Sequence, residues 1–304
     1  MTLEEILKDV NSDRVKKVIY DADSGCDLDD QFAIAHSWTS KKINLLSVNS
    51  TLFRNEFEKT DGTMEASHAE NQKVVRLIGA EGLCPVYPGC TQTVSSQPGF
   101  GPVDSPAVRN IIDTAMASDE IIYILATGAL TNVASAILTE PAVMDHICVI
   151  WVGSEGLDTG VTDEYNLFND YRAGQIVLNS GVPFIHLPGF GCRGTVKLAL
   201  SKAFFDRITL DCEVGTFFKK TLPDRYNLWK KFDTPGDFHI LWDVAASGVL
   251  SVPQAFTFSI IPAPVFTDDG KYAYDSTRHK IVYMEDINPT IVMDDVLDCI
   301  NTIQ

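Results

Sequence analysis

The sequence lacks the residue patterns that usually hold transition metals or disulfide frameworks. Its seven cysteines, at positions 26, 84, 90, 148, 192, 212 and 299, are scattered, odd in number and contain no CxxC pair. Its six histidines are also dispersed, and none belongs to an HxxxH or HExxH arrangement. Isolated thiols are typical of a reduced protein, so we expect a cytoplasmic location and no zinc or disulfide framework.

Positive charge and long apolar runs are also scarce. The chain has 24 Lys and Arg against 41 Asp and Glu, a formal net charge of -17. Nucleic-acid phosphates and anionic membranes both require basic patches, so we expect neither as a partner. No stretch approaches the roughly 20 apolar residues of a membrane span. The first residues, MTLEEILKDVNSDR, lack the basic and apolar regions of a signal peptide.

Apolar runs that alternate with amphipathic stretches indicate the fold class. Strands are predicted near 15–23, 43–51, 120–128, 146–154 and 182–189, and helices near 29–40, 64–79, 106–117, 131–139 and 169–180. Strands that alternate with helices are typical of βαβ units, so we predict an α/β fold with an open, mostly parallel sheet flanked by helices. No linker-like stretch occurs between 15 and 190, and we predict a single domain over residues 1–304.

An aromatic segment at about 200–240 differs in character from the rest. Its part 214–238 mixes Phe217, Phe218, Tyr226, Trp229, Phe232 and Phe238 with Lys, Arg and turn residues. We predict a partly helical, lid-like segment whose aromatic side chains cover a ligand. The alternative is a peripheral helix that packs on the core, which is the more common use of an aromatic stripe.

The stretch DADSGCDLDD places Asp21, Asp23, Asp27, Asp29 and Asp30 where the first predicted strand ends and a helix begins. Two carboxylates about 4 Å apart repel by about 1 kcal/mol in water and about 4 at an effective dielectric of 20. Such a cluster requires solvent, protonation or a bound cation, and five acids exceed what helix capping needs. Carboxylates without His or Cys select a hard cation. The spacing matches neither an EF-hand loop nor a P-loop.

Polar residues also end other predicted strands. Asn49 and Thr51 follow the second strand, and Thr127 follows the strand that contains EIIYILA. In parallel sheets ligands bind beyond the carboxyl ends of the strands, so we expect these side chains to converge on one crevice. A phosphatase of the haloacid-dehalogenase type also begins with a strand and a DxD pair, but no convincing downstream Lys and acidic pair follows in matching order.

Four stretches in the same order resemble the inosine-uridine-preferring nucleoside hydrolase family. DADSGCDLDD matches the DxDxGxDxDD variant of its N-terminal signature, and ATGALTNVASAI (126–137) resembles its TGPLTN segment. EYNLFNDYRAGQIVLNSGVPF (164–184) resembles its EFNxxxDPxAAxxVxxSGxP segment, and WDVAASGVL (242–250) occupies the place of its HD-containing helix start. The resemblance implies a Rossmann-like nucleoside hydrolase architecture.

The resemblance also implies an activity, a cofactor and site residues. Members hydrolyse the N-glycosidic bond of ribonucleosides around a bound Ca²⁺ that carries the attacking water. On the matched positions, Asp23 binds calcium and acts as general base, Asp30 and Asp243 are further calcium ligands, and Thr127 ligates through its backbone carbonyl. Asp29 holds the ribose 2′-hydroxyl, and Asn166 and Glu164 clamp the sugar. The implied partner is a nucleoside, and members are commonly homodimers or homotetramers.

Three departures from the family pattern affect individual residues. The extra Asp27 and Leu28 leave either Asp27 or Asp29 as the ribose contact. Ser50 and Thr51 replace a glycine-asparagine pair, so Thr51 or the out-of-register Asn49 takes that sugar contact.

Trp242 is the third departure, because many members have a histidine there that protonates the leaving base. An indole stacks on a flat ring but is no acid, so we expect Trp242 to stack on a base, with a purine preferred. His239 is then either a displaced acid that contacts the substrate or an ordinary loop histidine. Hydrolysis of another ribosylated ring compound and calcium-dependent sugar or nucleoside binding without catalysis stay open as alternatives.

Overall fold

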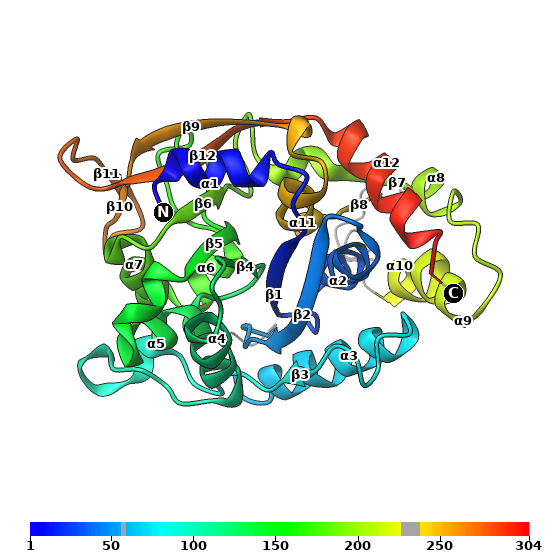
Figure 1. Cartoon of the computed structure of the whole chain (residues 1–304), viewed down its shortest axis with the longest axis horizontal. Coiled ribbons are helices and arrows are strands. Elements are labelled where there is room, and N and C mark those ends of the chain that lie inside the picture. The colour runs from blue at the N-terminus through cyan, green and yellow to red at the C-terminus, as the bar shows by residue number, and fades with distance from the viewer. Residues whose placement is uncertain (56–58, 226–237, 304) are drawn as a thin grey trace.

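The computed structural model describes residues 1–55, 59–225 and 238–303, and an eight-stranded sheet forms its centre (Figure 1). The strands are β1 Lys16–Ala22, β2 Ile43–Ser50, β3 Val86–Tyr87, β4 Ile122–Ala126, β5 Ile147–Val152, β6 Phe184–Leu187, β7 Ala199–Ser201, β8 Phe238–Ile240, β9 Phe256–Pro262, β10 Val265–Phe266, β11 Tyr272–Ala273 and β12 Lys280–Ile287. The order in the large sheet is β3-β2-β1-β4-β5-β6-β12-β9, and its pairs are parallel except that of β12 with β9. The predicted α/β fold with an open, mostly parallel sheet is confirmed.

The helices begin and end close to the predicted positions. They are α1 Leu3–Val10, α2 Asp29–Thr39, α3 Thr63–Leu77, α4 Pro106–Met116, α5 Thr131–Thr139, α6 Tyr165–Asn169, α7 Tyr171–Ser180, α8 Lys202–Phe205, α9 Glu213–Thr216, α10 Leu222–Arg225, α11 Val244–Ser251 and α12 Pro289–Ile300. The helix predicted over 169–180 is interrupted at Asp170, whose side chain accepts a hydrogen bond from Ala173 N and caps α7. Among the described residues, no helix combines the length and apolarity needed to cross a membrane.

Strand β1 is the point at which the order of the sheet reverses. The chain proceeds from β1 outward to β2 and β3, then returns to β4 on the other side of β1 and continues to β5 and β6. Asp21 pairs with Asn49 on β2 and with Ala126 on β4. In doubly wound sheets a crevice opens at such a reversal, beyond the carboxyl ends of the strands. The residues that follow β1 and β4 therefore lie side by side at this crevice.

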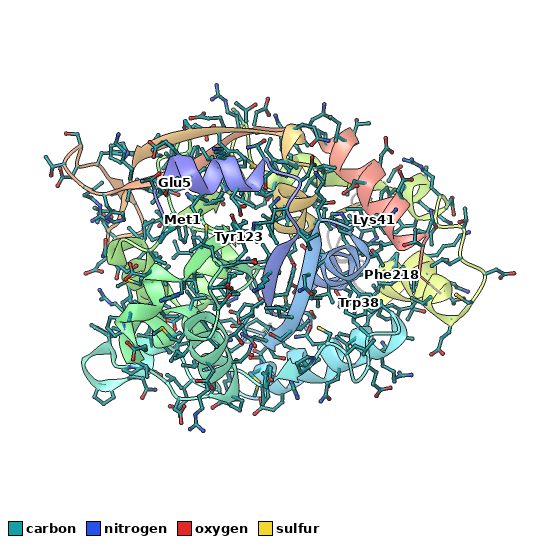
Figure 2. All side chains as sticks on the ribbon, viewed as in Figure 1. Met1, Glu5, Trp38, Lys41, Tyr123 and Phe218 are labelled. Atoms are coloured by element: carbon teal, nitrogen blue, oxygen red, sulfur yellow. The ribbon has the colours of Figure 1, made fainter. Side chains whose placement is uncertain are left out.

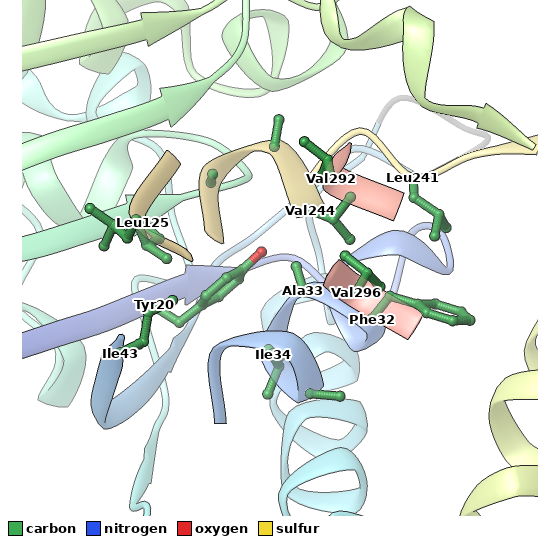
Figure 3. Close-up of a cluster of buried hydrophobic side chains, with 14 of the residues drawn as sticks. Tyr20, Phe32, Ala33, Ile34, Ile43, Leu125, Leu241, Val244, Val292 and Val296 are labelled. Atoms are coloured by element: carbon green, nitrogen blue, oxygen red, sulfur yellow. The ribbon is translucent and has the colours of Figure 1, made fainter. Parts of the chain in front are cut away.

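Successive side chains of the buried strands supply two separate cores, one on each face of the sheet. Val18 and Tyr20 of β1 pack with α2, α11 and α12, as the close-up in Figure 3 shows for Tyr20. Ile19 points to the opposite face and packs with residues of α4, α5 and α7. Tyr123 of β4 carries a polar anchor for α1, because its hydroxyl donates a hydrogen bond to Asp9 over 2.6 Å (Figure 2).

The segment at about 200–240 packs on the core over its described part. Phe217 and Phe218 lie in a π-helical turn between α9 and α10, and both are buried. The ring of Phe218 meets Phe32 of α2 edge-on at 4.8 Å between centroids, and Phe205 meets the same ring at 5.9 Å. Phe205, Phe217 and Phe218 therefore pack on the core, as the alternative to a lid predicted. Tyr226, Trp229 and Phe232 lie outside the described residues, so the lid stays a prediction there.

Candidate active site

A cavity of about 450 Å³ opens at the reversal of strand order, beyond the carboxyl ends of β1, β4, β5 and β6. Carboxylates and aromatic rings dominate its wall, and Arg54 supplies the cationic side chain. The lining residues are Asp23, Cys26, Asp27, Asp29, Arg54, Asn55, Thr127, Val152, Glu155, Asp163, Glu164, Tyr165, Asn166, Gly189, Phe190, Trp242 and Asp243. The structure thus brings together residues that are far apart in the sequence. This is expected beyond the carboxyl ends of parallel strands, where ligands bind.

Four buried carboxyl groups form the floor of this cavity. Asp23 follows β1, Asp29 and Asp30 begin α2, and Asp243 directly precedes α11; each is no more than 4% exposed. The carboxyl of Asp30 lies within hydrogen-bond reach of those of Asp23 and Asp243, and Asp29 also reaches Asp243. Thr127 Oγ1 donates a hydrogen bond to Asp30 Oδ1 over 2.6 Å. The helix start at Asp29 favours negative charge, but one helix end does not offset four carboxylates.

The ionisation of these groups shows what the floor requires. Burial, followed by the charge of Asp29, raises the pKa of Asp23 to about 8. The pKa of Asp30 lies well above its ordinary value because of burial and the neighbouring Asp23 carboxylate. Burial likewise raises the pKa of Asp27, to about 7. A bound cation removes this penalty, because it attracts each carboxylate and replaces its lost hydration.

The donor atoms fit a hard cation. Asp23 Oδ2 is buried and has no hydrogen-bond partner among the residues described, so it is available as a ligand. Carboxylate oxygens and the Thr127 carbonyl are the oxygen donors that calcium accepts. The backbone comes close at this point: a Cβ on Gly128 would lie 2.6 Å from Thr51 Cγ2 and 3.0 Å from Asp23 Cγ. Asp23, Asp243 and Thr127 line the cavity, and Asp30 contacts all three from behind this lining, so the four predicted metal ligands lie together.

Asp21 lies behind the floor and acts as a structural residue. Its side chain is fully buried, and Asn132 Nδ2 donates to Asp21 Oδ1 over 2.9 Å. The same Asn132 also donates to the Ser50 carbonyl and accepts from Cys90 N, so it joins β1, β2 and the loop after β3. Burial raises the pKa of Asp21 to about 7. The segment TGALTN (127–132) thus stabilises the acidic loop after β1 through the hydrogen bonds of Asn132.

The predicted sugar contacts Asn166 and Glu164 also line the cavity. Asn166 Nδ2 donates to the carbonyls of Thr127 and Val152, each over 2.9 Å, which leaves Oδ1 as its remaining polar atom. Glu164 caps α6: its carboxylate accepts from the backbone N–H groups of Ser154, Asn166 and Leu167. These bonds orient both side chains, because each is tied to the ends of β4 or β5. Asp27 and Asp29 both line the cavity.

Three predicted substrate contacts lie elsewhere in the structure. Asn49 is fully buried and its Oδ1 accepts from Asn110 Nδ2 over 2.9 Å, below the cavity. Thr51 stands behind Gly128 and donates to the Ala129 carbonyl. His239 lies on β8, which pairs with β7, and its ring packs edge-on against Phe205 while it faces a second cavity. The cavity lining therefore includes none of these three residues, and His239 lies on a strand.

Trp242 forms an aromatic wall with Phe190, a residue that was not predicted from the sequence. The rings of Trp242 and Phe190 lie 4.8 Å apart at 56°, and Phe190 is 48% exposed. Tyr165 stands at the same mouth and donates its hydroxyl to the Arg54 carbonyl. Glu155 and Arg54 also line the cavity without having been predicted. Phe190 and Glu155 both follow predicted strands directly, so the strand-end rule that found Thr127 also indicates them.

Comparison with known proteins identifies the family of this chain. The family model described as inosine-uridine preferring nucleoside hydrolase matches residues 18–294, which is most of the chain. The chain belongs to this family. The motifs around Asp23, Thr127, Asn166 and Asp243 all fall within the matched range.

Individual relatives differ in the specificity that their names carry. The chain is 28% identical over 280 residues to an inosine-uridine preferring nucleoside hydrolase of Leishmania major, which covers 82% of this chain and 83% of that protein. It is 30% identical over 200 residues to the pyrimidine-specific ribonucleoside hydrolase RihB of Escherichia coli O17:K52:H18, covering 56% of this chain and 58% of RihB. The match thus spans less than two thirds of that relative.

Solved structures share the fold. A plant nucleoside hydrolase, PpNRh1, superposes with a TM-score of 0.76 over 94% of this chain and 99% of that chain at 16% identity. A purine-preferring ribonucleoside hydrolase from Gardnerella vaginalis superposes with a TM-score of 0.75 over 95% and 99% at 19% identity. At these identities the likeness establishes the architecture alone.

Proposed function

We propose that this protein is a calcium-dependent N-ribohydrolase that converts a ribonucleoside and water into ribose and a free base. The observation that carries the proposal is the buried floor of Asp23, Asp30 and Asp243 beneath an aromatic-walled cavity. Family membership favours the same activity. An acidic floor also suits the reaction, because glycosidic cleavage passes through a cationic, oxocarbenium-like sugar.

The residues of the floor divide the work in this proposal. Asp30, Asp243 and the Thr127 carbonyl would hold the calcium, and Asp23 would both contact it and take a proton from the attacking water. When bound, calcium supplies positive charge that lowers the pKa of a water and orients sugar hydroxyls. A carboxylate within hydrogen-bond reach of the attacking water can take its proton, and a general base of this kind contributes roughly 10²–10⁴ in rate.

In this proposal the ribose contacts the carboxylates of the floor and also Asn166 and Glu164. We assign the 2′-hydroxyl to Asp29, whose carboxyl neighbours Asp243, with Asp27 as the competing contact. Asn166 Oδ1 and the Glu164 carboxylate face the sugar, and backbone hydrogen bonds hold them in place. These positions account for a preference for ribose, because each contact requires a hydroxyl.

The base stacks on the wall of Trp242 and Phe190. A purine offers the larger flat surface to this pair, which supports a purine preference. Relatives whose names specify purines and relatives whose names specify pyrimidines both match, so the base is tested directly. Another ribosylated ring compound of similar size fits the same wall, and it is the alternative substrate.

The decisive experiment measures ribose release from inosine, guanosine, uridine and p-nitrophenyl riboside, with calcium and with a chelator. We expect release that is lost on chelation, restored by calcium and abolished in Asp23→Ala. Asp119→Asn, an acid-to-amide change at a side chain 95% exposed, serves as the matched control and keeps full activity. Calcium and ribose binding without any release would indicate a binding protein. Phosphate release from p-nitrophenyl phosphate would instead indicate the phosphatase.

The oligomeric state is a further part of the proposal. The family resemblance implies a homodimer or homotetramer, and light scattering during size-exclusion chromatography measures it. A monomer at working concentrations would contradict this part without affecting the catalytic assignment.

A further inference from the structure

The proposed reaction requires a proton at the leaving base, and Trp242 cannot give it. When the bond between C1′ and the base breaks, the electron pair goes to a ring nitrogen, which is a poor anion unless it is protonated. The indole N–H of Trp242 is a hydrogen-bond donor but no acid. The four carboxyl groups of the floor are engaged with one another and with the cation site. A protein group that protonates the base must therefore be a carboxyl of the cavity wall outside this floor, such as Glu155.

Glu155 is a carboxyl group of that wall with no task in the cation site. It lies three residues after the end of β5, lines the cavity and is 9% exposed. Its carboxyl lies near the backbone N–H of Phe190, which favours the charged form. Its second oxygen, Oε2, is buried and has no hydrogen-bond partner in the described part of the chain. A buried carboxyl oxygen without a partner needs either a proton or a ligand.

The contact with Phe190 places Glu155 on the base side of the cavity. The Phe190 ring packs against Trp242, and these two rings form the wall on which the base stacks in the proposed function. The loop after β6 thus carries a stacking ring on its side chain and holds the Glu155 carboxyl through its backbone. The backbone of Glu155 is fixed as well, because its carbonyl accepts a hydrogen bond from the Tyr272 hydroxyl over 2.5 Å.

We propose that Glu155 is the general acid that protonates the departing base, a role that rests on the proposed function. The bond between C1′ and the base nitrogen breaks, and its electron pair stays on the base. The Glu155 Oε2–H proton moves to a ring nitrogen of the base, which leaves as a neutral molecule. The water oxygen bonds to C1′ and its proton passes to Asp23. Solvent then removes the proton from Asp23 and reprotonates Glu155, so the cycle closes.

The surroundings of Glu155 keep it protonated until it acts. Burial, followed by the charge of Glu164, raises the pKa of Glu155 to about 7, and Asp163 and Asp158 act in the same direction. Burial raises the pKa of Glu164 itself, and its three backbone hydrogen bonds oppose that shift by favouring the charged form. A general acid is most effective with a pKa near the working pH, and glycosidases raise the pKa of an acid carboxyl in this way.

The test compares two ribosides, one whose leaving group must be protonated and one whose leaving group departs without a proton. Inosine leaves as a poor anion, whereas p-nitrophenyl riboside releases nitrophenolate, which departs without protonation. We expect Glu155→Gln and Glu155→Ala to lower kcat for inosine by roughly 10² or more, and to change kcat for p-nitrophenyl riboside by less than about threefold. In the wild type, kcat for inosine should fall above a pH near 7, and kcat for p-nitrophenyl riboside should lack this decline.

Other outcomes overturn the proposal, and they are distinguishable. Equal losses on both substrates in Glu155→Gln would assign Glu155 a structural or ribose-binding role. Unchanged hydrolysis of inosine in both variants would remove it from the reaction. A wild type that hydrolyses neither substrate would instead refute the proposed function, and the role of Glu155 with it. Calcium affinity and melting temperature of Glu155→Gln, each matching the wild type, establish that the variant is folded.

Discussion

His36 Nδ1 lies 2.8 Å from Ser247 Oγ, and this contact joins α2 to α11 inside the core. Both helices begin with carboxylates of the cavity floor: α2 starts at Asp29 and Asp30, and α11 starts just after Asp243. The other ring nitrogen of His36 lies 2.8 Å from Asp295 Oδ2 on α12. One histidine therefore couples the two halves of the cation site to the same outer helix.

Replacement of Ser247 by alanine should loosen this coupling. The change leaves a buried ring nitrogen without its partner, so we expect the free energy of unfolding to fall by about 1–3 kcal/mol. We also expect weaker calcium binding in isothermal titration, since the two helix starts are no longer held together. Ser37→Ala is the matched control. Ser37 is on α2, next to His36, and its buried hydroxyl has no partner among the described residues. Equal behaviour of the two variants would refute the coupling.

Calcium should stabilise the fold because it binds a site that the unfolded chain lacks. At a calcium concentration of about 100 Kd we expect about 2.7 kcal/mol of added stability, measured by chemical denaturation with calcium and with a chelator. Thr127→Val keeps the backbone carbonyl but removes the donor to Asp30. We expect its calcium Kd to rise about tenfold, because hydrogen bonds to charged groups contribute about 1.5–3 kcal/mol.

The control for that variant is Thr302→Val, whose hydroxyl donates only to the Cys299 carbonyl near the C-terminal end. Its calcium affinity should match that of the wild type. If chelation leaves the denaturation midpoint of the wild type unchanged, the buried carboxylates of the floor hold no calcium.

Trp242 should contribute to base binding in proportion to the size of the base. Stacking of a base on an aromatic ring is worth about 1–3 kcal/mol, so Trp242→Ala should lower kcat/KM for inosine and guanosine by about tenfold to a hundredfold. The loss for uridine should be smaller, because its single ring covers less of the indole. Trp242→Phe should retain most of the activity. Equal losses for all three nucleosides in the alanine variant would contradict a stacking role.

His186 gives a prediction for the pH dependence of stability. It is fully buried, its Nε2 donates to the Gly153 carbonyl over 2.8 Å, and its Nδ1 has no partner within the described residues. Burial lowers its pKa from 6.5 to about 4. The unfolded chain therefore binds a proton that the native state does not, and stability is complete above pH 6.5 and lost as the pH falls toward 4.

The loss of stability depends on how far the pKa of His186 is lowered in the folded state. A fall from 6.5 to about 4 corresponds to about 3 kcal/mol. His186→Gln retains a donor for the Gly153 carbonyl and cannot titrate. Denaturation at several pH values should show that the difference between wild type and variant shrinks between pH 6.5 and 4. The raised pKa values of the floor carboxylates affect both proteins alike, so they cancel in this difference. A constant difference would exclude His186 as the source.

The elements that the sequence predicts correctly are those with strong local patterns. The five strands and the helices between residues 15 and 190 lie within a few residues of their predicted positions, because each buried strand is a short β-branched run bounded by turns. The pairing of β12 with β6, and of β9 with β12 in antiparallel orientation, was not predicted. That edge depends on contacts between distant segments, which no local pattern encodes.

The candidate site divides in the same way. Asp23, Thr127 and Asn166 were predicted because motifs and strand ends indicate them, and the cavity contains all three. Phe190 and Glu155 come from loops whose meeting depends on tertiary packing. For His239 the sequence left open a displaced acid or an ordinary loop histidine, and the pairing of β8 with β7 places that residue at another cavity. Local spacing was an unreliable guide where the chain forms a small separate sheet.

The reversal of strand order at β1 also determines when the site can form. Asp23 and Asp30 are made early during synthesis, but Asp243 follows only after the parallel strands β1 to β6. Until then, the acidic loop has no third carboxylate to complete a cation site, and its charges repel one another without compensation. A calcium site that needs all three carboxylates can therefore form only in a chain long enough to include the start of α11.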